Sequence, residues 1–191
     1  IPVGKWIIQN AFSMCTECRK YYPEFRVSIN LSYVQILKSP LMMELKQMIE
    51  HSGISCSGII VELTESGYLE GTPAVRSVWN DMKQLRIQIA LDDFGTGYSN
   101  LMNISNLEPD IVKLDRGFTL KALSRSYEYQ LMQYVIEMVH KLNQYVCVEG
   151  VETKEDLEKI KALGPDLIQG YYYSKPCSRD EFLKKFFGYS E

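Results

Sequence analysis

Residues 88–97 read QIALDDFGTG, and this stretch decides the fold. Its apolar opening has the length of a buried strand, and the glycine-rich segment that follows marks where the strand ends. Two adjacent aspartates, Asp92 and Asp93, stand at that end. The same pattern, an apolar run that ends in polar residues, recurs along the chain. It predicts further strands over 26–31, 58–63, 111–115, 145–149 and 167–171.

Helix-patterned stretches lie between these strands. Repeated strand–helix–strand units with continuous apolar strands are typical of a parallel sheet covered by helices. We therefore expect an α/β fold, and we expect one domain over 1–191 because no linker-like stretch divides the pattern. The helices are predicted over 4–20, 33–52, 72–85, 126–143 and 154–163.

Each predicted strand carries a polar residue near its carboxyl end. In a β/α barrel these ends converge on one face, where active sites are built. The alternative is that polar residues only end the strands and cap the next helices, which explains one or two positions but not all six. We therefore expect a site made by Asn30, Glu62, Asp92 with Asp93, Lys113 with Asp115, Glu149 and Gln169.

The side chains at these strand ends are mostly oxygen donors. Carboxylates and an amide, with no histidine or cysteine among them, suit Mg²⁺ or Mn²⁺ rather than zinc. Adjacent aspartates point to opposite sides of a regular strand, so at least one of Asp92 and Asp93 must lie where the strand turns into its loop. Such a pair can bridge two ions about 3.5–4 Å apart, a recurrent arrangement for phosphoester hydrolysis. Lys113 would supply positive charge for the attacking water or the phosphate oxygens.

Composition excludes several classes of protein. The 191 residues are 46% hydrophobic and 24% charged, which indicates a folded domain rather than a disordered chain. A net charge of −3 gives no basic surface for duplex nucleic acid. No apolar stretch approaches the roughly 20 residues that cross a bilayer, and no secretory signal opens the sequence. We expect no membrane contact by this segment and a cytoplasmic location, although the parent protein could be membrane-tethered.

Five cysteines, an odd number, are scattered along the chain and favour a reduced environment. Cys15 and Cys18 form a Cys-Thr-Glu-Cys motif inside a helix pattern, and no second pair completes a zinc site. We expect these two cysteines to be packing residues.

Linked motifs carry a more specific signal. They are VELTE (61–65), LDDFGTGYS (91–99), VKLD (112–115), EGVET (149–153) and QGY (169–171), together with Asn30 in SINLS (28–32). In this order they resemble the EAL-domain cyclic di-GMP phosphodiesterases over nearly the whole chain. The resemblance implies a bacterial signalling enzyme with a TIM-like (β/α) barrel, which hydrolyses cyclic di-GMP to linear pGpG with Mg²⁺ or Mn²⁺ in a two-metal site.

The resemblance also implies roles for individual residues. Lys113, Glu149 and Asp92 match catalytic positions, and Lys113 resembles the residue that orients or deprotonates the catalytic water. Gln169 resembles the glutamine at the floor of the metal site. The metal ligands would be Asn30, Glu62, Asp92, Asp93 and Glu149.

Other matching positions would support the site. Glu65 resembles the glutamate that anchors the loop over 94–99, and this loop takes part in metal binding and dimerisation in the family. Asp115 and Glu152 match further supporting positions. The loop residues concerned are Gly95, Thr96, Gly97 and Ser99. A homodimer is therefore expected, with a sensor or GGDEF-type domain upstream in the parent chain.

The sequence departs from the family in one respect. No Glu-Ala-Leu occurs in it, so that the strand carrying one metal ligand is missing and the barrel is expected to be incomplete at its N-terminus. Hydrolysis by this chain alone is accordingly an open question. Two alternatives remain, namely a catalytically inactive EAL-like module that binds cyclic di-GMP or a protein partner, and a different metal-dependent barrel hydrolase.

Overall fold

The computed structural model describes residues 2–38, 40–64, 73–95, 104 and 108–188. Its strands form one parallel sheet in which neighbours follow the order of the chain. This order, without reversals, is that of a β/α barrel. The strands are β1 (Val27–Asn30), β2 (Ile59–Thr64), β3 (Gln88–Phe94), β4 (Ile111–Leu114), β5 (Tyr145–Glu149) and β6 (Leu167–Gln169).

The chain forms two compact units, which are described separately. Unit 1 comprises Ile1–Leu63, Gly67–Ile89 and Pro176–Glu191, and unit 2 comprises Thr64–Ser66 and Ala90–Lys175. Strand β3 begins in the first unit and continues in the second. Within the described ranges, no helix is long and apolar enough to cross a membrane.

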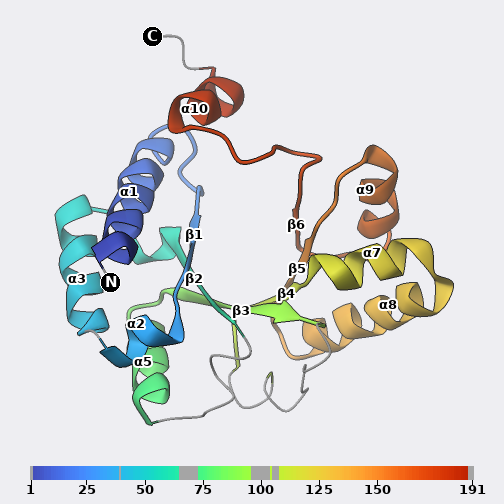
Figure 1. Cartoon of the computed structure of the whole chain (residues 1–191), viewed down its shortest axis with the longest axis horizontal. Coiled ribbons are helices and arrows are strands. Elements are labelled where there is room, and N and C mark those ends of the chain that lie inside the picture. Colours follow the sequence, from blue (N-terminus) through green and yellow to red (C-terminus); the bar gives the residue numbers. More distant parts are fainter. Residues whose placement is uncertain (1, 39, 65–72, 96–103, 105–107, 189–191) are drawn as a thin grey trace. The chain divides into compact units, whose positions relative to one another are not determined.

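In unit 1, α1 (Pro2–Cys18) packs against β1 and against α3 (Leu41–Ser52) (Figure 1). Helix α1 turns Ile8 and Phe12 inward at helical spacing, where they are almost completely buried. An ion pair of 2.7 Å between Lys5 and Glu44 joins α1 to α3. The helices of this unit are α1 (Pro2–Cys18), α2 (Tyr33–Lys38), α3 (Leu41–Ser52), α5 (Pro73–Gln84) and α10 (Arg179–Phe187).

Unit 2 holds β4, β5 and β6 with helices α7 (Arg116–Ser124), α8 (Ser126–Lys141) and α9 (Lys154–Lys161). All four residues of β4 are buried, as expected for a parallel strand covered on both faces. Helix α8 lies against α7 and β5 and buries Met132, Ile136 and Val139 on one face (Figure 1). These packed elements place the carboxyl ends of β4, β5 and β6 side by side.

The strand predictions are confirmed with small changes at their ends. Strand β4 stops at Leu114 because Asp115 becomes the N-cap of α7 and accepts a hydrogen bond of 2.7 Å from the Gly117 amide. Strand β6 stops at Gln169, where the chain comes close to the backbone of Val151, two residues after the end of β5. A Cβ placed on Gly170 would lie 2.0 Å from the Val151 carbonyl oxygen, so only glycine fits there.

One helix prediction is wrong, and two helices were missed. The single helix expected over 33–52 is interrupted between α2 and α3, because Pro40 has no backbone N–H with which to continue the helical hydrogen bonds. Helices α7 and α10 were not predicted from the sequence at all. Both are short, and packing stabilises such helices more than their intrinsic propensity does.

Cys15 and Cys18 lie on the buried face of α1. The Cys15 thiol is 3.6 Å from the Gly58 carbonyl oxygen and 3.7 Å from that of Phe25. Burial raises the pKa of the Cys15 thiol and raises the pKa of Cys18 to about 11. Both therefore pack as neutral thiols.

Candidate active site

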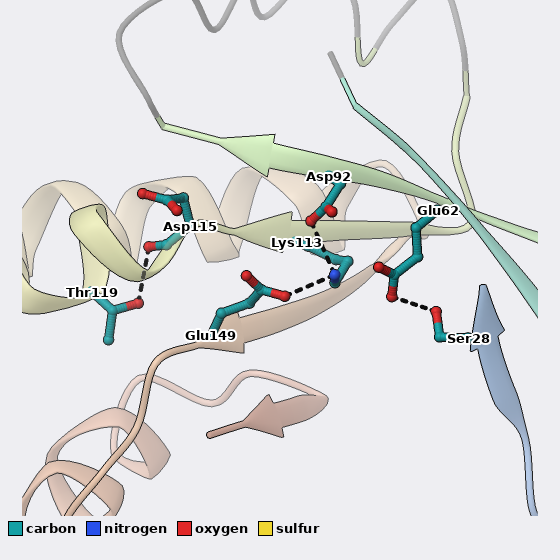
Figure 2. Close-up of polar contacts among 7 residues, drawn as sticks. All are labelled: Ser28, Glu62, Asp92, Lys113, Asp115, Thr119 and Glu149. Carbon is teal, nitrogen blue, oxygen red and sulfur yellow. Dashed lines mark hydrogen bonds and ion pairs between the residues drawn. The ribbon is translucent and has the colours of Figure 1, made fainter. Parts of the chain in front are cut away.

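Lys113 is the centre of the polar cluster in unit 2. Its side chain is buried, with 4% of the residue exposed. Its ammonium group lies 3.0 Å from Oδ1 of Asp92 and 2.7 Å from Oε1 of Glu149 (Figure 2). The three residues come from β3, β4 and β5, and the parallel register of β4 and β5 places Lys113 opposite Cys147, two residues before Glu149. Since side chains two residues apart share a face, Lys113 and Glu149 point to the same side of the sheet.

The local charge of this cluster is negative. Two carboxylates against one ammonium leave one net negative charge in a partly buried setting. Oδ1 of Asp92 is buried and accepts no hydrogen bond from the described residues, so its contact with Lys113 is purely ionic. A buried carboxylate oxygen without a hydrogen bond, in an all-oxygen donor set, fits a hard divalent cation.

The double aspartate lies on a β-bulge. Leu91 pairs with Val112 and Phe94 with Leu114, so three steps along β3 match two steps along β4. The extra residue is accommodated at Asp93, whose φ of 61° is in the left-handed region. Asp92 and Asp93 are therefore freed from strict alternation to opposite faces. Both aspartates nevertheless lie within β3, which continues to Phe94, so a bulge breaks the alternation and not the predicted turn into the loop.

The segment after β5 is fixed by the start of α7. Gly150 has a φ of 81°, and a Cβ placed on it would lie 2.3 Å from Cγ of Arg116. Arg116 in turn forms an ion pair of 2.7 Å with Glu152. This pair raises the pKa of the Arg116 guanidinium, chiefly through its hydrogen bond to Glu152. Glu152 thus supports the loop that follows Glu149, while Asp115 caps α7.

Asn30 and Glu62 belong to unit 1. They are register partners on β1 and β2, so their side chains lie on the same face of the sheet. Glu62 is buried and accepts a hydrogen bond from the Ser28 hydroxyl (Figure 2). A buried carboxylate at this position needs such partners, since an unpaired buried charge is costly.

The predicted site residues are thus divided between unit 1, which holds Asn30 and Glu62, and unit 2, which holds the cluster around Lys113. Asp92, Lys113 and Glu149 are in direct contact, and Gln169 is the register partner of Glu149 on β6. Gly95 follows β3 with a φ of 102°, so glycine suits it. Within the described ranges no three His, Cys, Asp or Glu side chains form a ready metal-binding group. Glu65, Thr96, Gly97 and Ser99 lie outside the described residues.

Sequence reasoning missed three residues at these strand ends. Ser28 was overlooked because a serine in a strand is common. Arg116 directly follows the VKLD motif, and Tyr171 ends the QGY motif. Both positions line a cavity with Glu149 and Glu152. Their closeness to the motifs was the available signal, but only the fold shows that they face one space.

Comparison with known proteins gives a consistent result. The EAL domain family model matches residues 1–176. The chain is 34% identical over 182 residues to the uncharacterized protein y4lL of Sinorhizobium fredii, covering 95% of this chain and 22% of that protein. It is 30% identical over 174 residues to the cyclic di-GMP phosphodiesterase PdeF of Escherichia coli, covering 91% of this chain and 23% of PdeF. The chain thus spans less than a quarter of the length of these relatives.

A solved structure supports the fold. The EAL enzyme Bd1971, described in a form with bound cAMP and cyclic di-GMP, superposes with a TM-score of 0.91 at 29% identity. The match covers 97% of this chain and 51% of the Bd1971 chain. The fold is therefore a TIM-like (β/α) barrel of the EAL type, as predicted, and the residues that the structure describes form six of its parallel strands.

Proposed function

Since this chain belongs to the EAL domain family, we propose that it is the phosphodiesterase part of a cyclic di-GMP signalling protein. The reaction adds water to one phosphodiester of cyclic di-GMP. The water oxygen bonds to phosphorus, the bond from phosphorus to the ribose 3′-oxygen breaks, and that oxygen takes up a proton. The product is linear pGpG. The placement of Lys113 between Asp92 and Glu149 is the observation that carries the proposal.

Asp92, Asp93 and Glu149 would hold the divalent cations in unit 2. Asn30 and Glu62 are proposed as further ligands on the strength of their motif positions. Two bound Mg²⁺ or Mn²⁺ ions would supply water activation and would stabilise the charge that develops at phosphorus. Gln169, the register partner of Glu149, would support that carboxylate from β6.

Lys113 would act directly on the reacting groups. Its buried ammonium is held in place by two carboxylates, so it is oriented before any substrate arrives. A fixed, desolvated positive charge can orient the attacking water or stabilise the phosphate oxygens, and it costs no reorganisation during the reaction. Orientation and charge stabilisation are therefore its proposed roles.

Properties of the parent protein are also proposals. We infer that it works in the cytoplasm as a homodimer, with the loop over 94–99 and its anchor Glu65 at the dimer contact. A sensor or GGDEF-type domain would precede this segment. The single domain expected over 1–191 would then be one module of a longer chain.

The test is chromatography for pGpG after incubation of this chain with cyclic di-GMP and Mn²⁺. We expect linear product, and we expect none from the Asp92→Ala variant. Glu137→Ala, on the exposed side of α8, is the matched control and should retain activity. Cyclic di-AMP as a competing substrate would identify a hydrolase of different specificity.

The second candidate is a binding module without hydrolysis. The observation in its favour is that the described residues contain no ready group of three metal-ligating side chains. Binding of cyclic di-GMP without any pGpG, by the wild-type chain in saturating Mn²⁺, would support this candidate and overturn hydrolysis by this chain.

A further inference from the structure

A cavity of about 580 Å³ lies among three helices of unit 1, and we call it the helix cavity. Its walls are one face of α1, the last turn of α3 and the first residue of α10 (Figure 1). Two contacts join these walls. The Thr16 hydroxyl donates a hydrogen bond of 3.4 Å to the Ser52 carbonyl oxygen, and Arg179 forms an ion pair with Glu17. The helix cavity is therefore built from segments that only the fold brings together.

The helix cavity lies toward the amino ends of β1 and β2. Cys15, in the C-terminal half of α1, is 3.7 Å from the Phe25 carbonyl oxygen and 3.6 Å from that of Gly58. These two residues come just before β1 and β2 begin. Asn30 and Glu62 stand toward the carboxyl ends of the same strands. A ligand in the helix cavity would therefore be separate from the metal ligands proposed in unit 1.

Three basic side chains line the helix cavity, namely Lys20, His51 and Arg179. In the described part of the chain, the side chains of Lys20 and His51 form no ion pair or hydrogen bond. Arg179 contacts Glu17 through Nη2, and its side chain is 55% exposed. Two permanent positive charges against one carboxylate leave one net positive charge, and a protonated His51 adds a second. This local charge is opposite in sign to the net charge of −3 on the whole chain.

The remaining lining of the helix cavity is polar. The Gln9 amide and the Ser13 hydroxyl line it from α1, and neither group makes a hydrogen bond within the described ranges. Every described residue that lines the cavity is polar or charged. A flat apolar ring would therefore find no stacking partner there, whereas a compound rich in hydroxyl groups would find hydrogen-bond partners.

We propose that the helix cavity binds a phosphate ester of a polyhydroxy compound, such as a sugar phosphate. The phosphate would meet Lys20, His51 and Arg179, and the hydroxyl groups would meet Gln9 and Ser13. A phosphate monoester carries a charge of about −1.5 to −2 near pH 7, which matches the local positive charge. Guanidinium and ammonium groups are the usual donors to phosphate oxygens. The volume lies within the range of small-molecule sites, roughly 300–1,000 Å³, and exceeds what a phosphate alone would fill.

The experiment uses the histidines as probes. The chain has two of them, so NMR of the imidazole rings gives one probe in the cavity, His51, and one outside it, His140, which contacts Asp166. Glucose 6-phosphate, inorganic phosphate and glucose are titrated separately at constant pH and ionic strength in EDTA. Glucose 6-phosphate should shift the His51 signals in a saturable way and leave those of His140 in place. Inorganic phosphate should bind more weakly, and glucose should not bind.

A pair of lysine variants tests whether the binding depends on the cavity. Lys20→Gln should weaken the binding of glucose 6-phosphate about tenfold, because one charged donor to the phosphate is lost. Lys46→Gln removes the same charge from an exposed position on α3 that does not line the cavity, so its Kd should equal that of the wild type. Both lysines are exposed and neither forms an ion pair with a described residue, so both variants should unfold at the wild-type urea concentration.

Four results would overturn the proposal. The first is the absence of a saturable shift of the His51 signals with glucose 6-phosphate. The second is an equal loss of affinity in Lys20→Gln and Lys46→Gln, which would indicate a general charge effect. Equal affinities for glucose and glucose 6-phosphate would show that the phosphate is not recognised. Equal affinities for inorganic phosphate and glucose 6-phosphate would show that the polyhydroxy part is not recognised. None of these results bears on hydrolysis of cyclic di-GMP, because the inference does not depend on the proposed function.

Discussion

Lys113 determines how two carboxylates of the cluster can lie close together. Asp92 and Glu149 would repel each other without a cation between them, and the ammonium group supplies that charge from within the chain. The same contacts hold the lysine in one position. The stability of the fold and the proposed hydrolysis therefore both depend on the Lys113 side chain.

Replacing Lys113 with methionine should affect both properties. We expect pGpG formation to fall at least about 100-fold, because the positioned charge is lost. Without metal, the free energy of unfolding should fall by about 3 kcal/mol, since two partly buried carboxylates lose their partner. Urea denaturation in EDTA measures this change. Lys159→Met is the control, because it breaks an exposed ion pair on α9 and should leave the midpoint of urea unfolding unchanged. If Lys113→Met and Lys159→Met shifted this midpoint equally, the prediction would be contradicted.

At the scale of elements, the contact between the ends of β5 and β6 depends on a glycine. Gly170 brings the chain against the backbone of Val151, where a hydrogen bond of 3.0 Å from the Tyr172 amide to the Val151 carbonyl closes the contact. The cavity in unit 2 and the Glu149–Gln169 register both depend on this approach.

Gly170→Ala should destabilise the protein by about 2–3 kcal/mol, because the new Cβ overlaps backbone that cannot move away. Gly164→Ala is the control. Gly164 has a φ of 77° but no atom within 4 Å of its added Cβ, so only conformational strain of about 1 kcal/mol is expected. Thermal and urea unfolding give the comparison. A larger cost at Gly164 would show that β6 can shift away from Val151.

The N-terminus of α10 gives a prediction for pH. Ser178 and Glu181 form a capping box, and hydrogen bonds from the Ser178 backbone and side chain lower the pKa of Glu181. Since the folded pKa is below the unfolded one, this stabilisation is fully present above the unfolded pKa of about 4.3 and is lost as the pH falls through the folded pKa.

Comparison of the wild type with Glu181→Gln tests this dependence. The difference between their unfolding temperatures should be constant from pH 7 to pH 5 and should shrink at lower pH. Glu158→Gln, on the exposed surface of α9, is the control for a general charge effect. If the difference in unfolding temperature between the wild type and Glu181→Gln grew as the pH fell, the lowered pKa of Glu181 would be contradicted.

At the scale of the whole molecule, metal binding and folding should be linked. Unfolded chains do not assemble the proposed ligands, so Mn²⁺ at 100 times its Kd should stabilise the fold by about 2.7 kcal/mol. Calorimetry with Mn²⁺ or EDTA measures the shift. Asp92→Ala should reduce it strongly, while Glu137→Ala should keep it. An equal shift in both variants would place the metal elsewhere.

Much of the fold could be predicted because strand signals are local. Apolar runs with polar ends identified the six strands seen in the described part of the chain, and the motif order identified the family. The break at Pro40 was readable from the same sequence and was missed. Helix α10 could not be found from periodicity, since contacts such as that between Phe25 and Phe182 hold it in place.

The sequence by itself determined where the strands lie along the chain, the family and the residue types at the strand ends, because those properties depend on neighbours along the chain. Only the tertiary structure decided that Lys113 bridges Asp92 and Glu149, that Asp93 occupies a bulge, and that Arg116 and Tyr171 share a cavity. These contacts depend on the register of the strands and on close approach between segments that are far apart in the sequence. The packing of side chains fixes the distances between such segments, and no local sequence pattern encodes that packing.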